Sequence, residues 1–272
     1  MFDPGAYLDR IGLAEPPAPN AGGLALLQAA HRRAIPFENL DIPLGRGVSL
    51  DPAHIFDKLV TARRGGYCFE QSSLYLAALH ALGFEARALL ARVWLGAAGV
   101  PPRTHTLNLV AIDGEDWISD VGFGGGDVPP LRLMGGAEAE TADGARHRLH
   151  FDPDHGWMLE RRGPRVAADD RAPPGDDWYR QYSFSTEEVA PADLEMANHW
   201  TATRPGTRFT TRVIVSLVPA GGFLSLVDRI LSVSGPTNEK IVIETPGQYR
   251  ALLESAFGIA LTAGEVERLE LF

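Results

Sequence analysis

Residues 68–95 of this 272-residue chain, CFEQSSLYLAALHALGFEARALLARVWL, contain the change of periodicity that decides the fold. Apolar residues in the first half recur at intervals of three and four, which predicts a helix that begins near Cys68. They are Leu74, Ala77, Ala78, Ala81 and Leu82. Gly83 is placed to cap the end of this helix. Ala88 to Leu95 is short, apolar and β-prone, which predicts a strand.

The part of the chain before this stretch is predicted to be helical. The expected helices are Ala6 to Leu13, Leu24 to Arg33 and His54 to Thr61. The Pro-rich stretch Glu15 to Pro19 ends the first, and Asp51-Pro52 favours the start of the third.

The part after Gly83 is predicted to be mostly strand. After Ala88 to Leu95, the expected strands are Thr106 to Ile112, Trp117 to Val121, Trp157 to Arg161, Gln181 to Ser185, Arg208 to Leu217, Phe223 to Val227, Ile230 to Val233 and Lys240 to Glu244. We expect a loop over Asp169 to Asp177 and helices over Ala190 to Asn198, Pro246 to Phe257 and from Ala263. Helices, then strands, then a mixture favour an α+β fold over an alternating doubly wound sheet.

Composition restricts the class of protein. The net charge of −10 argues against a general role in binding nucleic acid or acidic membranes. The single cysteine cannot form an intramolecular disulfide and fits a reducing compartment. The start Met1-Phe2-Asp3-Pro4 lacks the pattern of a signal peptide, and no 18-residue apolar run predicts a membrane span. We therefore expect a cytoplasmic protein without nucleic-acid or membrane partners.

Cys68 lies in Arg63-Arg64-Gly65-Gly66-Tyr67-Cys68-Phe69-Glu70, at the predicted start of a helix. The positive end of a helix lowers the pKa of a thiol and favours the reactive thiolate. A lone cysteine is also often an inert buried residue. This motif alone leaves two interpretations open, one in which Cys68 is catalytic and one in which it is structural.

His105 and Asp120 are brought together by a predicted hairpin. Asp113-Gly114 is a strong two-residue turn signal, and with that turn the numbers of paired residues sum to 227. His105 and Asp120 then lie on the same face as diagonal neighbours, about 7–8 Å apart between backbones. This gives a base and a carboxylate that can orient it. Either residue could instead be structural, and seven other histidines occur at His31, His54, His80, His147, His150, His155 and His199.

Gly122-Phe123-Gly124-Gly125-Gly126 follows Asp120 directly. Successive backbone N–H groups in such a loop can bind an anion. The segment matches neither of the common nucleotide-binding glycine motifs, since Pro129-Pro130 follow it. On its own it is equally well a turn at the end of a strand.

Taken together, these blocks resemble the arylamine N-acetyltransferase family. Arg64 to Glu70 is similar to its nucleophile motif, Thr104 to Val110 to its histidine strand, and Asp120 to Gly124 to its aspartate segment. Ile35 to Leu40 resembles a further block, and Asp193 to Asn198 and Pro205 to Phe209 a weaker one. The resemblance covers about residues 7–245.

The resemblance implies an α+β fold in three parts around a cysteine-protease/transglutaminase-like core. Residues 1–84 would form a helical bundle that carries the nucleophile. Residues 85–190 would form a β-barrel that carries the histidine and the aspartate. Residues 191–272 would form an α/β lid that includes the interdomain helix.

The resemblance also implies the chemistry. Cys68 is the expected nucleophile, His105 its base and Asp120 the orienting carboxylate. Acetyl-CoA is the expected acyl donor, in a ping-pong mechanism without a metal, and a small arylamine or hydrazine is the acceptor. The expected donor contacts are Thr106, Phe123, Gly124, Gly125 and Gly126, and the expected acceptor contacts are Phe37, Tyr67 and Phe209.

The sequence departs from the family at Gln71, Ser72, Arg204 and Gly126, and Arg204 bears on the preference for the acceptor. Two other functions stay open. One is a macrolactam-forming amide synthase on the same scaffold, and the other is a transglutaminase-like thiol hydrolase, which shares the Cys–His–Asp order. The oligomeric state is not predicted.

Overall fold

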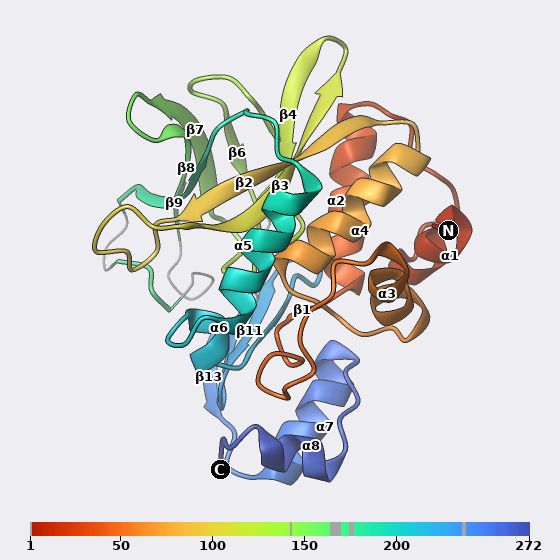
Figure 1. Ribbon diagram of the computed structural model, residues 1–272, viewed down its shortest axis with the longest axis vertical. Helices are drawn as coiled ribbons and strands as arrows, with labels where there is room; N and C mark the ends of the chain where they lie inside the picture. Colours follow the sequence, from red (N-terminus) through yellow and green to blue (C-terminus); the bar gives the residue numbers. More distant parts are fainter. Residues whose placement is uncertain (1, 142, 164–169, 174–176, 236–237) are drawn as a thin grey trace.

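The computed structural model describes residues 2–141, 143–163, 170–173, 177–235 and 238–272. Helices come first along the chain, then a large antiparallel sheet, then a smaller sheet with the C-terminal helices beside it (Figure 1). This is the α+β arrangement that the order of predicted elements indicated.

The helical part consists of α1 (Pro4–Ile11), α2 (Ala21–Ala34), α3 (Pro52–Phe56), a π-helical turn η1 (Asp57–Thr61) and α4 (Cys68–Ala81). Polar side chains begin these helices: Asp3 accepts a hydrogen bond from the Ala6 N–H, and Asn20 accepts one from the Gly23 N–H. Gly83, with a φ of 85°, follows α4 as expected. Each predicted helix is therefore confirmed, with its ends moved by a few residues.

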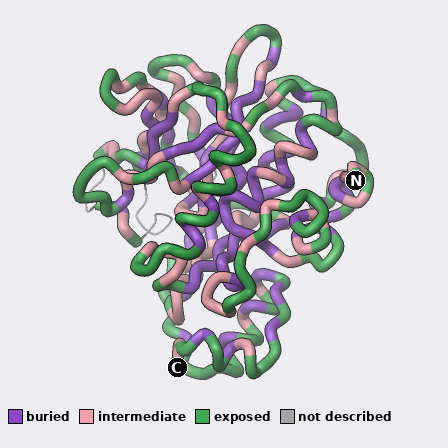
Figure 2. The backbone as a smooth tube through the Cα atoms, viewed as in Figure 1, coloured by how far each residue is buried: buried purple, intermediate pink, exposed green. Residues whose placement is uncertain are grey.

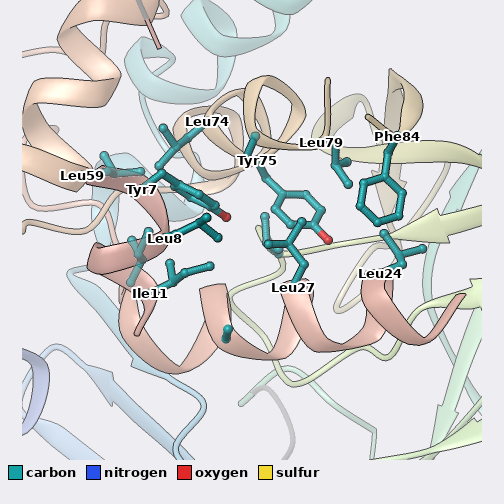
Figure 3. Packing of buried hydrophobic residues seen from close by; sticks show 14 of the residues in the cluster. Tyr7, Leu8, Ile11, Leu24, Leu27, Leu59, Leu74, Tyr75, Leu79 and Phe84 are labelled. Atoms are coloured by element: carbon teal, nitrogen blue, oxygen red, sulfur yellow. The ribbon is translucent and has the colours of Figure 1, made fainter. Parts of the chain in front are cut away.

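Side chains from these helices pack into one apolar cluster, which Figure 3 shows from close by. Tyr7, Leu8 and Ile11 of α1 lie at one end of this cluster, and Leu24 of α2 and Leu79 of α4 lie at the other (Figure 3). Leu27 of α2 and Tyr75 of α4 lie between them. Burial of so much apolar surface holds α2 against α4 and thereby gives the N-terminus of α4 a defined position.

The large sheet has eight strands in the order β5-β4-β3-β2-β9-β8-β7-β6, all antiparallel. Their bounds are β2 (Glu85–Val93), β3 (Arg103–Ile112), β4 (Glu115–Ser119), β5 (Leu131–Arg132), β6 (Glu138–Glu140), β7 (Arg146–Asp152), β8 (Gly156–Arg162) and β9 (Tyr179–Phe184). Leu131 of β5 and Leu149 of β7 belong to the same apolar cluster as Leu107 of β3. The sheet therefore curls around a shared interior, although β5 and β6 end it on either side and the expected barrel is only nearly closed.

The β3–β4 hairpin has the predicted turn and register. Asp113 and Gly114 both have positive φ, 53° and 79°, which is the conformation of the two-residue turn that matches strand twist. Five residue pairs, from Asn108 with Ser119 to Ile112 with Glu115, sum to 227 as expected. His105 lies inside β3, and Asp120 lies one residue beyond the end of β4. The observed ends of both strands therefore differ by a few residues from the predicted ends.

The smaller sheet has five antiparallel strands in the order β1-β10-β11-β12-β13. Its strands are β1 (Phe37–Glu38), β10 (Ile214–Leu217), β11 (Phe223–Val227), β12 (Ile230–Ser234) and β13 (Glu239–Val242). The remaining helices are α5 (Pro191–Thr203), α6 (Arg208–Thr211), α7 (Pro246–Phe257) and α8 (Ala263–Arg268). Since β1 comes from the helical region, this sheet joins the two ends of the chain. The domain limits at residues 84 and 190 stay a prediction.

One predicted element is wrong in part. The strand expected over Arg208 to Leu217 is a strand only from Ile214, and residues 208–211 form α6. Threonines gave this stretch its β-prone composition, but their hydroxyls bind nearby carbonyls: Thr210 binds Arg204 O at 3.0 Å, and Thr211 binds Thr207 O at 2.8 Å. Such local bonds compete with a strand ladder. Of the predicted loop, residue 169 and residues 174–176 lie outside the described part of the chain, and the others are neither helix nor strand.

Buried residues gather where the helices meet the two sheets (Figure 2). No helix in the described ranges is both long enough and apolar enough to cross a membrane. Within those same ranges, no group of three or more His, Cys, Asp and Glu side chains is placed to hold a metal ion.

Candidate active site

A cavity of about 290 Å³ opens where the helical part, the large sheet and the smaller sheet meet. Cys68, His105 and Phe37 line it, together with the segment Gly122 to Gly125. The rest of its lining comes from Val93, Pro102, Thr104, Asp170, Arg171, residues 200–201 and 204–209, Ile214, Phe223 and Ser225. Both the predicted nucleophile and its predicted base therefore face the same space.

Cys68 is the first residue of α4, and only 2% of it is exposed. Its Sγ donates a weak hydrogen bond to Thr104 O at 3.8 Å. Thr104 is the extra residue at an irregularity in the β2–β3 ladder, because Ala91 pairs with His105 whereas Arg92 pairs with Arg103. Such a bulge turns the backbone locally and places this carbonyl beside the thiol.

The loop before Cys68 is held by a buried ionic network. Lys58 Nζ lies 2.7 Å from Asp41 Oδ2 and 2.7 Å from Glu70 Oε1, and Arg64 Nη2 lies 2.6 Å from Glu38 Oε1. The other oxygen of Glu70 accepts a hydrogen bond from the Tyr67 N–H at 3.0 Å, which ties the network to the start of α4. Burial raises the pKa of Glu70 to about 7, with Lys58 acting in the opposite direction. The network thus fixes the residues on both sides of Cys68.

His105 and Asp120 form the predicted pair. His105 Nε2 donates to Asp120 Oδ2 at 2.7 Å, and both residues are buried. Burial raises the pKa of Asp120, but His105 and then Arg32 lower it by more, so the net pKa lies below its usual value. Asp120 is therefore an ionised acceptor that fixes the imidazole tautomer and directs Nδ1 away from itself.

The thiol of Cys68 differs from the sequence-based expectation. Burial raises its pKa well above the usual range, and the Asp120 carboxylate raises it further. The backbone N–H groups of Phe69 and Cys68 lower this pKa, as a helix N-terminus should, but by less. The helix end alone therefore does not stabilise a thiolate at this buried position.

Glycines are required where the Gly122–Gly126 segment passes the catalytic region. A Cβ at residue 122 would lie 2.9 Å from Cys68 Cα, and one at residue 124 would lie 2.7 Å from Phe37 Cε1. Both distances are shorter than side-chain contacts allow, so only glycine lets this segment come so close. Phe123 stacks edge-on against His105, with 5.3 Å between ring centroids.

Three predicted contact residues do not line the cavity. Thr106 is buried and binds Leu89 O through Oγ1, because neighbouring strand residues point to opposite faces and His105 takes the face toward the cavity. The Gly126 carbonyl binds Arg32 on the side toward α2. Tyr67 is fully buried, donates to Asn198 Oδ1, and packs against Phe209 with 5.6 Å between centroids. These three residues therefore lie outside the cavity lining, and their contact with a ligand stays a prediction.

The aromatic residues Phe37 and Phe209 do line the cavity, and their rings are 5.9 Å apart. The sequence did not indicate two further groups. Gln28 supports Asp120 by accepting hydrogen bonds from its N–H at 3.0 Å and from Ser119 Oγ at 2.6 Å. Trp200 and Thr201 of α5 also line the cavity. A buried glutamine in α2 carries no local signal for such a role.

A cysteine at a helix N-terminus, a histidine that lines the same cavity and a carboxylate bound to that histidine are the groups on which thiol enzymes with covalent intermediates rely. The fold and the site thus define a class of group-transfer enzyme or hydrolase. The comparisons with known proteins narrow this class.

The N-acetyltransferase family model matches residues 22–266. An arylamine N-acetyltransferase of Mycolicibacterium smegmatis is 38% identical over 269 residues, which cover 96% of this chain and 93% of that protein. The solved arylamine N-acetyltransferase of Salmonella typhimurium is 33% identical and superimposes with a TM-score of 0.89, covering 99% of this chain and 98% of that one. The Mycobacterium marinum enzyme, solved in complex with CoA, is 32% identical, with a TM-score of 0.87 and 98% of each chain covered.

The chain belongs to the arylamine N-acetyltransferase family. It is an acyltransferase with the α+β fold of that family.

Proposed function

We propose that this enzyme transfers the acetyl group of acetyl-CoA to a small arylamine or hydrazine by a ping-pong mechanism. In this proposal Cys68 is the nucleophile, His105 its base and Asp120 the orienting carboxylate. The convergence of Cys68 and the His105–Asp120 pair on one open cavity supports it most directly. The CoA complex of the Mycobacterium marinum relative supports the choice of donor. The cytoplasmic location stays a prediction.

In the first half-reaction, the Cys68 proton passes to His105 and the thiolate attacks the thioester carbonyl of the donor. Sγ forms a new bond to the acetyl carbon, the bond from that carbon to the sulfur of CoA breaks, and His105 returns the proton to the departing thiolate. Burial of Asp120 beside His105 favours this transfer, because the carboxylate stabilises the imidazolium in a water-poor setting.

In the second half-reaction, the neutral amine attacks the acetyl carbon on Cys68. The nitrogen forms the amide bond, the bond from carbon to Sγ breaks, and the amine proton passes through His105 to restore the thiol. Exchange between thioesters is nearly balanced, whereas transfer from a thioester to an amide is downhill. Arylamines suit the step because their low basicity leaves them neutral near pH 7.

The lining of the cavity supports an aromatic acceptor. Phe37 and Phe209 offer two ring faces within one cavity, and aromatic side chains stack favourably on a planar ring. Phe123, Gly124 and Gly125 line another part of the cavity, which is available to the donor.

A steady-state assay of CoA release tests the function. With acetyl-CoA and a panel of arylamines and hydrazines, we expect release that depends on the amine and parallel double-reciprocal lines when both concentrations vary. Intersecting lines would contradict the ping-pong order. Turnover of a peptide or ester without any use of acetyl-CoA would instead favour a thiol hydrolase, and ring closure of a carrier-bound amino-acyl chain would favour an amide synthase.

The alkylation rate of Cys68 with iodoacetamide should depend on His105 in a specific way. In the wild type we expect rapid alkylation below pH 7, because His105 accepts the thiol proton. In His105→Gln the base is lost and burial, which raises the pKa of the thiol, remains. Alkylation of this variant should therefore become fast only above about pH 9, beyond the free-thiol value near 8.5.

His199→Gln is the matched control, since His199 is an exposed histidine of α5 whose side chain makes no contact in the site. Its alkylation profile should coincide with that of the wild type. A wild-type rate that rises along a single curve centred near pH 8.5 would show that Cys68 and His105 form no ion pair.

A further inference from the structure

The glycine-rich segment is held from behind by one buried arginine of α2. Arg32 is only 6% exposed, and its Nη1 donates to Val121 O at 3.1 Å. Its Nη2 donates to Gly126 O at 2.6 Å, and both nitrogens share Phe123 O at 3.3 Å. Asp127 balances the charge, with Oδ1 at 3.2 Å from Arg32 Nε.

These bonds decide which way the Phe123–Gly124 peptide faces. The chain has no cis peptide bond in its described part, so the C=O and the N–H of this peptide point in opposite directions. Its carbonyl faces Arg32, and its N–H therefore points away from α2, on the side where Phe123 and Gly124 line the cavity. Among the described residues, no acceptor binds the Gly124 N–H, whereas the Gly122 N–H is bound by Asp120 Oδ1 at 2.9 Å.

The guanidinium also strengthens this N–H as a donor. Hydrogen bonds from a charged group are stronger than neutral ones, and bonds in series polarise one another. Two such bonds to Phe123 O draw electron density toward that oxygen and leave the Gly124 N–H more positive. An amide prepared in this way binds a carbonyl oxygen well.

We propose that Arg32 is a positioning residue for the acyl donor. Arg32 holds the Gly124 N–H toward the donor, where this N–H binds a carbonyl oxygen of the chain that is attached to the thioester. The inference rests on the proposed use of acetyl-CoA. Its ligand chemistry is an amide carbonyl on a chain attached to the acyl thioester. A small acetyl ester that lacks such a chain makes no use of this N–H.

Arg32→Lys tests the role with the charge retained. A lysine still neutralises Asp127, but its single ammonium group cannot hold three carbonyls in a fixed fork. A second variant, Arg32→Met with Asp127→Asn, removes both partners and so leaves no buried unpaired charge. Arg33→Met is the matched control, because Arg33 is the exposed neighbour on the same helix.

Each variant is assayed with acetyl-CoA and with 4-nitrophenyl acetate, an activated ester without the pantetheine chain. For Arg32→Lys, which keeps the charge that lowers the pKa of Asp120, we expect KM for acetyl-CoA to rise about tenfold or more, with KM for the ester and the rate of the amine step changed less than twofold. In the double variant the lost charge also affects Asp120, so the rise in KM for acetyl-CoA should exceed the rise in KM for the ester about fivefold or more. Arg33→Met should match the wild type with both donors. An unchanged KM for acetyl-CoA would overturn the proposal. An equal rise in KM for both donors would also overturn it, because general disorder of the site affects both donors alike.

A direct reading of the amide separates this inference from the proposed function. Addition of CoA to the ¹⁵N-labelled wild type should move the Gly124 N–H resonance downfield, and in Arg32→Lys this shift should be at most half as large at saturation. A wild type that does not release CoA from acetyl-CoA would refute the proposed function itself. A wild type that does so while the Gly124 resonance stays in place would refute only the role of Arg32.

Discussion

Cys68→Ala should reduce acetyl transfer to an arylamine to background. The only thiol of the chain is then gone, and with it the nucleophile that we propose for the acetyl intermediate. Loss of the nucleophile in a comparable triad lowers turnover about 10⁶-fold. Incubation of the wild type with acetyl-CoA alone should add one acetyl group, and peptide mass spectrometry should assign it to Cys68.

Cys68→Ser keeps the shape of the side chain and provides the control for packing. Its circular dichroism spectrum and melting temperature should match those of the wild type, while its turnover should fall nearly as far as that of Cys68→Ala, since a hydroxyl is a much weaker nucleophile. An alanine variant that retains more than about a hundredth of the wild-type turnover would disprove the covalent mechanism, as would an acetyl group on another residue.

Asp120→Asn should lower kcat about 10³- to 10⁴-fold. The carboxylate accepts one hydrogen bond from His105 Nε2 at 2.7 Å and one from the Gly122 N–H at 2.9 Å. An asparagine has a single acceptor oxygen, which can bind only one of these two donors. In either orientation its NH₂ group therefore faces the other donor. The imidazole then loses its tautomer and its support, and in a serine-protease triad the same change costs about 10⁴ in turnover.

Asp116→Asn is the matched control, because Asp116 is an exposed residue of β4 whose side chain has no part in the site. It should keep the wild-type rate. A loss smaller than tenfold in Asp120→Asn would mean that Asp120 is peripheral to the reaction. Thermal melting of both variants is needed beside the kinetics, since the Gly122 contact also supports the glycine-rich segment.

Local patterns gave the framework that carries these residues. The spacing of apolar residues by three and four after Cys68 is enough to predict that α4 begins at this cysteine, since helix ends depend mainly on nearby residues. The Asp113-Gly114 turn is enough to set the β3–β4 register, because a two-residue turn leaves one pairing. That register in turn was sufficient to expect His105 and Asp120 on one face, where they form a hydrogen bond.

Local patterns did not predict which residues line the cavity. Tyr67 and Thr106 adjoin Cys68 and His105 in the sequence, yet both are turned into the core. Thr210 and Thr211 fall within a predicted strand, but their hydroxyls instead bind nearby carbonyls in local turns. Neighbours in sequence point in different directions, and which direction meets a ligand depends on what packs behind each residue.

The sequence by itself determined the order of elements, the hairpin register and the placement of His105 beside Asp120, because periodicity and turn chemistry act over a few residues. Only the tertiary structure decided how those residues are supported. Gln28 and Arg32 lie about 90 residues before the backbone groups they bind, a separation that no local pattern can bridge. The tertiary structure also decides the charge state of Cys68. Burial by several elements raises the pKa of this thiol, whereas the helix end would lower that pKa.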